Sequence, residues 1–285
     1  MERTYTDSIP PPKKIANTMT TSSSLPTLLF DYGGTLDSAA VHWNFILLEG
    51  YHHASLPMVG GEAWRDAYVY GERALAKHPI IAPSDDFHTL LLKKVRMEMH
   101  YLVAHRCVDF PLAPGEEYAI GGLADAVYPD CPWPLSPEAE AAAVEIAAYC
   151  DAKVKERMAE SRVVLEELRC RGYRMVLVTN FYGNIHSVLR AYGIEGFFDA
   201  VVESAVVGVR KPDPAIWRMG AEAAGRAPGE CIAIGDSFDK DIQAAGAAGC
   251  RTVWFKGVEW KTAKRDETLP THIITALPEL LDLEL

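Results

Sequence analysis

The sequence predicts an α/β protein: a three-layer core built on a parallel sheet, with an all-α cap domain inserted after the first strand. Short apolar runs typical of buried strands alternate with helical patterns across 158–285. One further apolar run, Leu28–Phe30, lies far upstream of the others. The segment between, 38–157, shows no convincing strand and far exceeds the usual connection of about 4–6 residues, so it is predicted to be a folded insertion.

The first segment, 1–26, has a different composition from the rest of the chain. It holds the prolines Pro10–Pro12 and the polar run Thr20–Ser24, and it lacks the apolar stretch of a secretory signal. Such a composition buries little apolar surface, so we expect a disordered tail. Order is predicted to begin at Thr27, and the core then comprises 27–37 and 158–285.

The cap, 38–157, is expected to be helical. Apolar residues of Phe87–Leu102 recur on one helical stripe, with Ser84 as the expected N-cap. Ser136–Glu138 has the features of a helix start, because proline fits the first turn and an acid follows. The proline-rich stretches Phe110–Pro114 and Tyr128–Pro137 are predicted loops.

The chain enters the cap near Asp37–Val41 and leaves it near Val154–Glu160. We expect these two connections to act as the hinge of a lid that covers the strand ends of the core.

Strand and helix patterns then alternate along the rest of the core, so right-handed crossovers and helices on both sheet faces are expected. The expected elements are a helix around Ser161–Cys170, strand Arg174–Val178, helix Ile185–Ala191, strand Phe198–Val202, helix Pro214–Ala224, strand Cys231–Ile234, helix Asp239–Ala248, strands Thr252–Trp254 and Ile273–Ile274, and helix Pro278–Leu283.

Composition excludes several classes of protein. The chain has 285 residues, 49% hydrophobic and 24% charged, which is typical of a globular protein. Its formal net charge of −11 argues against a nucleic-acid-binding or anionic-membrane-binding surface. No apolar run approaches the length of a membrane span. The 6 cysteines form no C-x-x-C pair, which favours reduced thiols and a cytoplasmic location.

Three predicted strands end in polar groups that suit phosphoryl transfer. Asp31 follows the first strand, Thr179 and Asn180 follow the second, and Asp236 follows a later one, while Lys211 lies between the last two. Because ligands of parallel α/β sheets bind at the carboxyl ends of the strands, these side chains are expected to converge.

The same residues form four motifs in order: DYGGTL at Asp31–Leu36, VTN at Val178–Asn180, KPDP at Lys211–Pro214 and GDS at Gly235–Ser237. With them, the chain resembles the haloacid dehalogenase-like hydrolases over about Thr27 to Leu285, in the subgroup with a helical cap after the first strand. The resemblance implies a Rossmann-like core and Mg²⁺-dependent hydrolysis of a small phosphorylated metabolite through an aspartyl-phosphate intermediate.

The resemblance also implies roles for individual residues. Asp31 is the expected nucleophile, which divides ester hydrolysis into two steps. The implied Mg²⁺ ligands are Asp31, the backbone carbonyl of Gly33, and Asp236; carboxylates, waters and phosphate oxygens suit this ion. Lys211 is the expected cation for the phosphate and the nucleophile.

Three further residues have supporting roles. The Thr179 hydroxyl and the Asn180 backbone N–H are expected to donate to phosphoryl oxygens as charge develops. Asp239 and Asp241 are both candidates for a second acid after Asp236, and spacing favours Asp241 as an outer partner of the metal site rather than a direct ligand.

One position departs from the phosphatase pattern. Phosphatases of this family carry a general acid two residues after the nucleophile, where this chain has Gly33. The loss indicates a substrate with a good leaving group or an acid from the cap, for which His42 is the candidate. Two alternatives stay open: a phosphonate C–P hydrolase that uses a cap lysine (Lys77, Lys93 or Lys94), and a phosphate-binding pseudo-enzyme without turnover.

Overall fold

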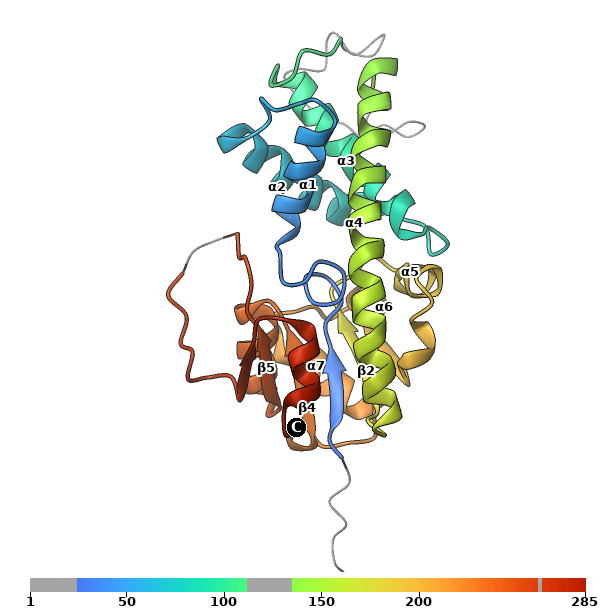
Figure 1. Ribbon diagram of the computed structural model, residues 1–285. Coiled ribbons are helices and arrows are strands. Elements are labelled where there is room, and N and C mark those ends of the chain that lie inside the picture. Colours follow the sequence, from blue (N-terminus) through green and yellow to red (C-terminus); the bar gives the residue numbers. More distant parts are fainter. Residues whose placement is uncertain (1–24, 112–134, 261–262) are drawn as a thin grey trace, which may run out of the picture.

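The computed structural model describes residues 25–111, 135–260 and 263–285. The expected tail up to residue 24 and most of both proline-rich stretches, Phe110–Pro114 and Tyr128–Pro137, lie outside these ranges. Described residues form a sheet-based core with a helical cap at one end of the sheet (Figure 1).

The core is one parallel sheet of six strands in the order β3-β2-β1-β4-β5-β6, which confirms the predicted class. The strands are β1 (Thr27–Phe30), β2 (Met175–Thr179), β3 (Ala200–Glu203), β4 (Cys231–Gly235), β5 (Arg251–Phe255) and β6 (His272–Ile274). β1 lies at the centre although most of its neighbours come from beyond residue 170, so the long insertion leaves and re-enters beside the first strand.

Helices cover both faces of the sheet. Leu29 of β1 packs with α7 (Pro214–Ala223) and α8 (Ala244–Ala248), whereas its neighbours Leu28 and Phe30 belong to the core that includes α4 (Pro137–Cys170). Successive strand residues point to opposite faces, so a strand buried on both faces reads as a continuous apolar run. The remaining short elements are α5 (Ile185–Ala191), α6 (Ser204–Val207), and the 3₁₀ turns η2 (Glu195–Phe197), η3 (Pro228–Glu230) and η5 (Leu277–Asp282).

The cap elements that the structure describes are helices joined by loops, and no named strand of the sheet comes from the described part of 38–157, as predicted. It comprises α1 (Trp43–His53), α2 (Gly61–Lys77), α3 (Phe87–Ala104) and the first half of α4. α4 starts where expected, because Ser136 Oγ accepts the Ala139 N–H at 3.3 Å. The expected N-cap Ser84 is wrong: Asp86 caps α3, since its carboxylate accepts the Thr89 N–H at 2.8 Å.

The two connections between cap and core differ from the expected pair of hinges. Val154–Glu160 lies inside α4, a 34-residue helix that runs from the cap along the core without a break (Figure 1). The passage from cap to core near these residues therefore lies within a helix, because buried residues continue through it, and its role as a hinge stays a prediction. The domain boundary at 157/158 stays a prediction, because it falls inside a helix and no loop separates the two domains there.

The entry connection is held by a loop that follows β5. Ala39 and Ala40 both have positive φ, 53° and 59°, a conformation that costs non-glycine residues energy. Val258 N–H donates to the Ala40 carbonyl at 2.7 Å, and His42 N–H donates to the Val258 carbonyl at 3.0 Å. This close approach requires glycine at position 257, because a Cβ there would lie 2.1 Å from the Ala40 oxygen.

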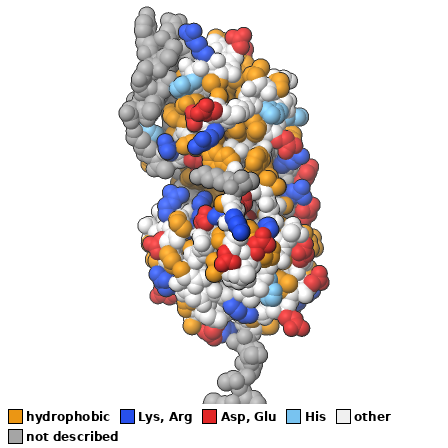
Figure 2. Space-filling view, turned by 90° about the vertical axis from the view of Figure 1, so that its left-hand side faces the viewer, with side chains coloured by type: hydrophobic (Ala, Val, Ile, Leu, Met, Phe, Trp, Pro, Cys, Tyr) orange, Lys and Arg blue, Asp and Glu red, His pale blue; other side chains and the backbone are white. Residues whose placement is uncertain are grey.

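Two C-terminal elements depart from simple α-helix. The expected helix Asp239–Ala248 begins with a π turn, η4 (Phe238–Gln243), before α8. The last expected helix is the 3₁₀ turn η5. No described helix combines the length and apolar character needed to cross a membrane. On the face shown in Figure 2, acidic and basic side chains are interspersed over the core.

Candidate functional site

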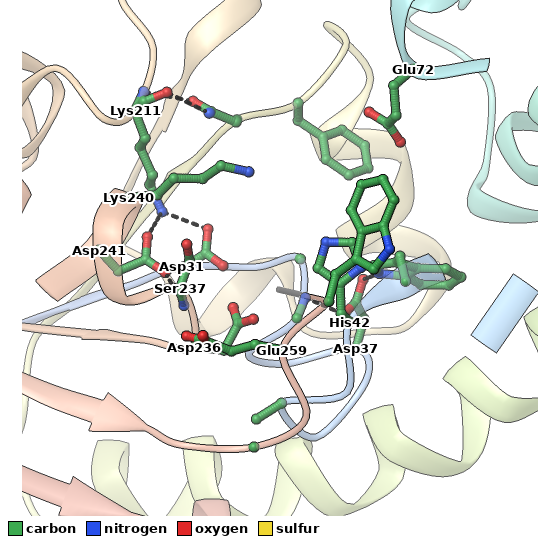
Figure 3. A pocket seen from close by; sticks show the side chains of 18 of the residues that line it. Asp31, Asp37, His42, Glu72, Lys211, Asp236, Ser237, Lys240, Asp241 and Glu259 are labelled. Carbon is green, nitrogen blue, oxygen red and sulfur yellow. Dashed lines mark hydrogen bonds and ion pairs between the residues drawn. The ribbon is translucent and has the colours of Figure 1, made fainter. Parts of the chain in front are cut away.

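A cavity of about 460 Å³ lies between the carboxyl ends of the strands and the cap (Figure 3). Its core side includes the loop after β1, the loop after β2 and η4, and its cap side includes residues of α1, α2 and α3. The parallel topology explains the position, because the carboxyl ends of adjacent strands meet at one edge of the sheet.

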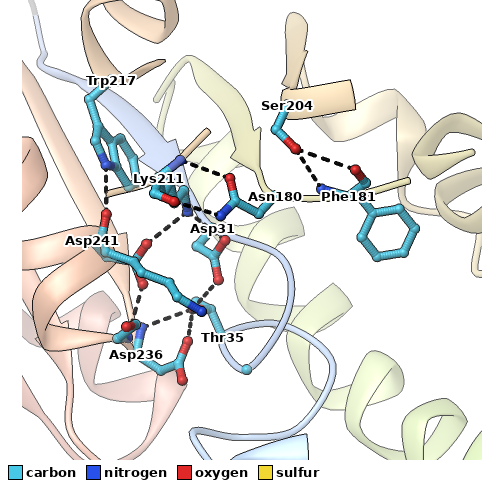
Figure 4. A network of polar contacts seen from close by, with 12 residues as sticks. Asp31, Thr35, Asn180, Phe181, Ser204, Lys211, Trp217, Asp236 and Asp241 are labelled. Atoms are coloured by element: carbon cyan, nitrogen blue, oxygen red, sulfur yellow. Dashed lines mark hydrogen bonds and ion pairs between the residues drawn. The ribbon is translucent and has the colours of Figure 1, made fainter. Parts of the chain in front are cut away.

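Lys211 joins two acidic side chains at the floor of the cavity. Its Nζ lies 2.6 Å from Asp31 Oδ1 and 2.8 Å from Asp241 Oδ1 (Figure 4). All three side chains are almost fully buried. Burial, opposed by the charge of Lys211, raises the pKa of Asp31 to about 6. The ring of Trp217 lies 4.4 Å below the ammonium, so the lysine has both ionic and cation–π contacts.

Asp236 and Thr35 complete the acidic cluster. The Thr35 hydroxyl lies 3.2 Å from both Asp31 Oδ2 and Asp236 Oδ1, and it accepts the Asp236 N–H at 3.1 Å. Gly34 has φ of 96°, and a Cβ on it would lie 2.4 Å from the Asp236 carboxylate oxygens. Only glycine lets the loop approach Asp236 this closely.

The cluster suits a divalent cation. Oxygens of Asp31, Asp236 and Asp241 lie within 4.8 Å of one another. Burial, and then the charges of Asp241 and Asp31, raise the pKa of Asp236 well above its usual range. Bringing buried carboxylates together is unfavourable unless a cation binds them, and Mg²⁺ prefers such oxygen ligands. Asp241 already pairs with Lys211, which fits an outer position for it.

The expected phosphate donors occupy different settings. The Asn180 side chain accepts the Lys211 N–H at 2.9 Å and donates to the Lys211 carbonyl at 3.0 Å, so it fixes the backbone of Lys211. Asn180 lines the cavity. Thr179 ends β2 and is 1% exposed, and it is not among the residues that line the cavity.

The structure leaves open space beside Gly33. It is exposed to the cavity, its φ lies outside the left-handed region, and a Cβ on it would meet no heavy atom within 4 Å. Where the phosphatase pattern has a carboxylate, this chain therefore has open space, and no other described side chain fills it.

His42, the candidate replacement acid, lines the cavity from the cap side. Its Nδ1 accepts the Asn44 N–H at 3.1 Å, so the neutral ring carries its proton on Nε2. Burial lowers the pKa of His42 to about 4. At neutral pH it offers a hydrogen-bond donor rather than an acidic imidazolium, which favours substrate binding over proton transfer.

Asp37 is a second buried acid near the nucleophile. Its carboxylate accepts the Gly34 N–H at 2.7 Å and the Trp43 indole N–H at 3.0 Å. Burial raises its pKa to about 7, yet the residue is 1% exposed and both oxygens are engaged. We interpret Asp37 as a group that positions the loop after β1.

The cap wall combines one ion pair with apolar and aromatic side chains. Lys94 pairs with Glu72, and the Tyr182 hydroxyl of the core donates to Glu72 at 3.4 Å. Burial lowers the pKa of Lys94, but the charge of Glu72 and smaller contributions from its other neighbours together outweigh this effect, so the pKa lies well above its usual range. The other cap-side residues are His42, Trp43, Tyr68, Phe87, Leu90 and Leu91.

Sequence reasoning missed several of these residues. Thr35 and Asp37 lie within or beside the first motif, so their proximity to Asp31 in sequence was a usable indication. Glu72, which lines the cavity, and Trp217, which contacts the Lys211 ammonium, carry no such indication, because their positions depend on helix packing. Lys240 lies between Asp239 and Asp241, the two acids considered for the fourth motif, and the sequence does not show that its side chain faces the cavity.

Comparisons with known proteins identify a family, related sequences and structures of the same fold. A family model described as haloacid dehalogenase-like hydrolase matches residues 26–249. The chain is 38% identical over 96 residues to phosphoserine phosphatase of Thermus thermophilus, covering 33% of this chain and 39% of that protein. It is 33% identical over 152 residues to glyceraldehyde 3-phosphate phosphatase of Methanopyrus kandleri, covering 52% and 65%.

A third relative carries only a domain description. Haloacid dehalogenase-like hydrolase domain-containing protein 3 of Mus musculus is 33% identical over 122 residues, 42% of this chain and 49% of that protein. The matches thus span between 39% and 65% of the length of these three relatives.

Among solved structures, a dehalogenase shares the fold with a TM-score of 0.54 at 16% identity, covering 91% of this chain and 96% of that one. An L-2-haloacid dehalogenase gives 0.51 at 17% identity, covering 91% and 98%. At these identities the likeness concerns the fold alone.

Proposed function

We propose that this chain, which belongs to the haloacid dehalogenase-like hydrolase family, is a Mg²⁺-dependent phosphatase of a small phosphorylated metabolite. The observation that carries the proposal is the Lys211 ammonium between Asp31 and Asp241, beside Asp236, at the floor of a cavity that the cap covers. Phosphatases among the relatives support the same reaction class.

In this proposal a carboxylate oxygen of Asp31 attacks phosphorus, the ester P–O bond breaks, and the leaving oxygen keeps the electron pair and takes a proton from water. Water then hydrolyses the aspartyl phosphate, which releases inorganic phosphate and restores the Asp31 carboxylate. Lys211 keeps the carboxylate in place and balances the charge of the incoming phosphate. Asn180 holds Lys211 through its backbone. Bound Mg²⁺, held by Asp31, Asp236 and the Gly33 carbonyl, would neutralise charge on the phosphate.

The phosphonate alternative has less support. A lysine that forms a Schiff base has to lose its proton, and pairing with Glu72 keeps Lys94 protonated. Lys93 pairs with Asp85 at 2.5 Å. The side chain of Lys77 lies outside the described residues.

The test is a phosphatase screen over a panel of phosphorylated metabolites, with and without Mg²⁺. We expect Mg²⁺-dependent release of phosphate that falls by at least about 10³-fold in Asp31→Asn, because the nucleophile is lost. Asp282→Asn, a change on the exposed face of η5, is the matched control and should keep full activity. Turnover that survives in Asp31→Asn would refute the assignment, and Mg²⁺-dependent phosphate binding without turnover would favour the pseudo-enzyme.

A further inference from the structure

Among the described residues, four basic side chains line the cavity, and three of them have acidic partners. Lys94 pairs with Glu72, Lys211 with Asp31 and Asp241, and Arg265 with Glu259 and Asp239. Within the described parts of the chain, Lys240 is the cavity-lining cation for which no ion pair is found. An ammonium group that faces a substrate cavity without a partner has its charge available for an anion.

The position of Lys240 is fixed through its backbone. It lies on η4 immediately before Asp241, and its carbonyl accepts the Trp217 indole N–H at 3.0 Å. The side chain leaves the Asp31–Lys211 group and points into the cavity toward the cap residues Glu72 and His42 (Figure 3). Its charge helps to lower the pKa of both of these groups, so its field reaches the cap wall.

The described part of the cap wall carries no net charge that could attract a substrate anion. Of the cap residues that the structure describes at this wall, the two charged ones, Lys94 and Glu72, neutralise each other, and the others are apolar, aromatic or neutral histidine. With the phosphoryl group at Asp31, the leaving group has to extend from the floor toward this wall and pass Lys240. On this path the leaving group passes the Lys240 ammonium, the described cavity-lining cation that no ion pair occupies, so this charge can bind an anion.

We infer that Lys240 is a specificity-determining residue that binds a carboxylate on the leaving group, so that the substrates are phosphate monoesters of carboxylic acids. This inference rests on the proposed function. One free cation matches one monoanionic group, whereas a second phosphate would bring more negative charge against Glu72 and Glu259. The aromatic side chains Trp43 and Trp260 supply contact surface for the carbon skeleton.

The test compares two probes that differ in one charge: 4-carboxyphenyl phosphate and its neutral carboxamide, 4-carbamoylphenyl phosphate. We expect the wild-type protein with Mg²⁺ to prefer the carboxylate by about tenfold in kcat/KM, mostly through KM, as a charge-assisted hydrogen bond predicts. Lys240→Gln should bring the ratio to about one, and Lys240→Arg should keep it. Lys256→Gln is the matched control, because that lysine pairs with Glu267 and does not line the cavity.

A wild-type ratio near one, or a preference that survives in Lys240→Gln, would overturn the inference while leaving the phosphatase proposal intact. An equal loss on both probes would also overturn it, since Lys240 would then contact the phosphoryl group. Calorimetry with Mg²⁺ can measure the binding of two phosphonates that are not hydrolysed, 4-carboxybenzylphosphonate and 4-carbamoylbenzylphosphonate. The ratio of their Kd values reports the preference for a carboxylate without turnover. The preference in binding without hydrolysis would support the role of Lys240 and contradict the phosphatase.

Discussion

Gly33→Asp is the substitution that most directly tests how this site handles the leaving group. The position lacks the acid of the phosphatase pattern. Both carboxylate oxygens of Asp37 accept N–H bonds, and His42 is a neutral imidazole at neutral pH. If the missing acid limits the rate, a carboxyl group at residue 33 should accelerate hydrolysis of esters whose leaving oxygen needs protonation.

The structure indicates that the new side chain fits. A Cβ at residue 33 meets no heavy atom within 4 Å, and the backbone is not in the left-handed region. Replacing glycine at a compatible position raises the free energy of unfolding by about 0.4–1 kcal/mol, because the unfolded chain loses conformational freedom. Repulsion between the new carboxylate and the nearby acids lowers the free energy of unfolding by a similar amount. The melting temperature should therefore change little. A positioned general acid contributes about 10²–10⁴-fold in rate.

The assay compares an alkyl and an aryl ester. Steady-state kcat/KM with Mg²⁺ is measured on glycerol 1-phosphate and on 4-nitrophenyl phosphate. We expect Gly33→Asp to raise the alkyl rate by about 10²-fold or more and the aryl rate by less than about threefold, because nitrophenolate leaves without protonation. Gly33→Asn, which has the same size without an acidic proton, is the matched control and should show no selective gain.

A well-folded Gly33→Asp protein without selective gain on the alkyl ester would refute the reasoning, since the proton would then come from elsewhere. His42→Ala would be measured next. The tautomer fixed by Asn44 predicts that this variant raises KM and leaves the alkyl-to-aryl ratio unchanged.

Three further predictions concern the metal, the cap and the loop after β5. Saturating Mg²⁺, at about 100 times its Kd, should stabilise the fold by about 2.7 kcal/mol, and Asp236→Asn should abolish this shift in melting temperature; equal shifts would contradict the metal site. Burial raises the pKa of Glu98 to about 8 from an ordinary 4.5, so the folded state holds a proton that the unfolded state releases, and the free energy of unfolding should fall by up to about 1.4 kcal/mol per pH unit over that interval. In urea unfolding, Glu98→Gln should remove this slope and exceed the wild type in stability at pH 8, and parallel pH curves would disprove the assignment. Gly257→Ala should lower the free energy of unfolding by about 1–3 kcal/mol, because its Cβ would overlap the Ala40 carbonyl. Gly246→Ala in α8, which has open space around it, is the control and should cause no such loss. Equal stability of the two variants would show that the loop after β5 can move to accommodate the methyl group.

The sequence was sufficient for the class of the core and for the order of its elements. Parallel strands buried on both faces are continuous apolar runs, as at Thr27–Phe30 and Cys231–Gly235, and such runs are visible without any tertiary information. The acids Asp31 and Asp236 could be placed together for the same reason, since each ends a strand and parallel strands end at one edge.

Tertiary packing decided the details that local patterns do not encode. The chain passes from cap to core within α4, because one continuous helix can bury successive faces against different partners, so no turn residue marks the boundary. Asp86 rather than Ser84 caps α3, a choice between neighbouring polar residues that depends on where the packed helix begins.

The same holds for the cavity wall. Glu72, Lys94 and Tyr182 come from separate elements, and their contact depends on how α2 and α3 dock over the loop after β2. Lys240 shows the limit most clearly. Its residue type was readable, but the charge of a lysine is available only where no acid lies within reach, and three-dimensional packing decides which of the nearby acids already have partners.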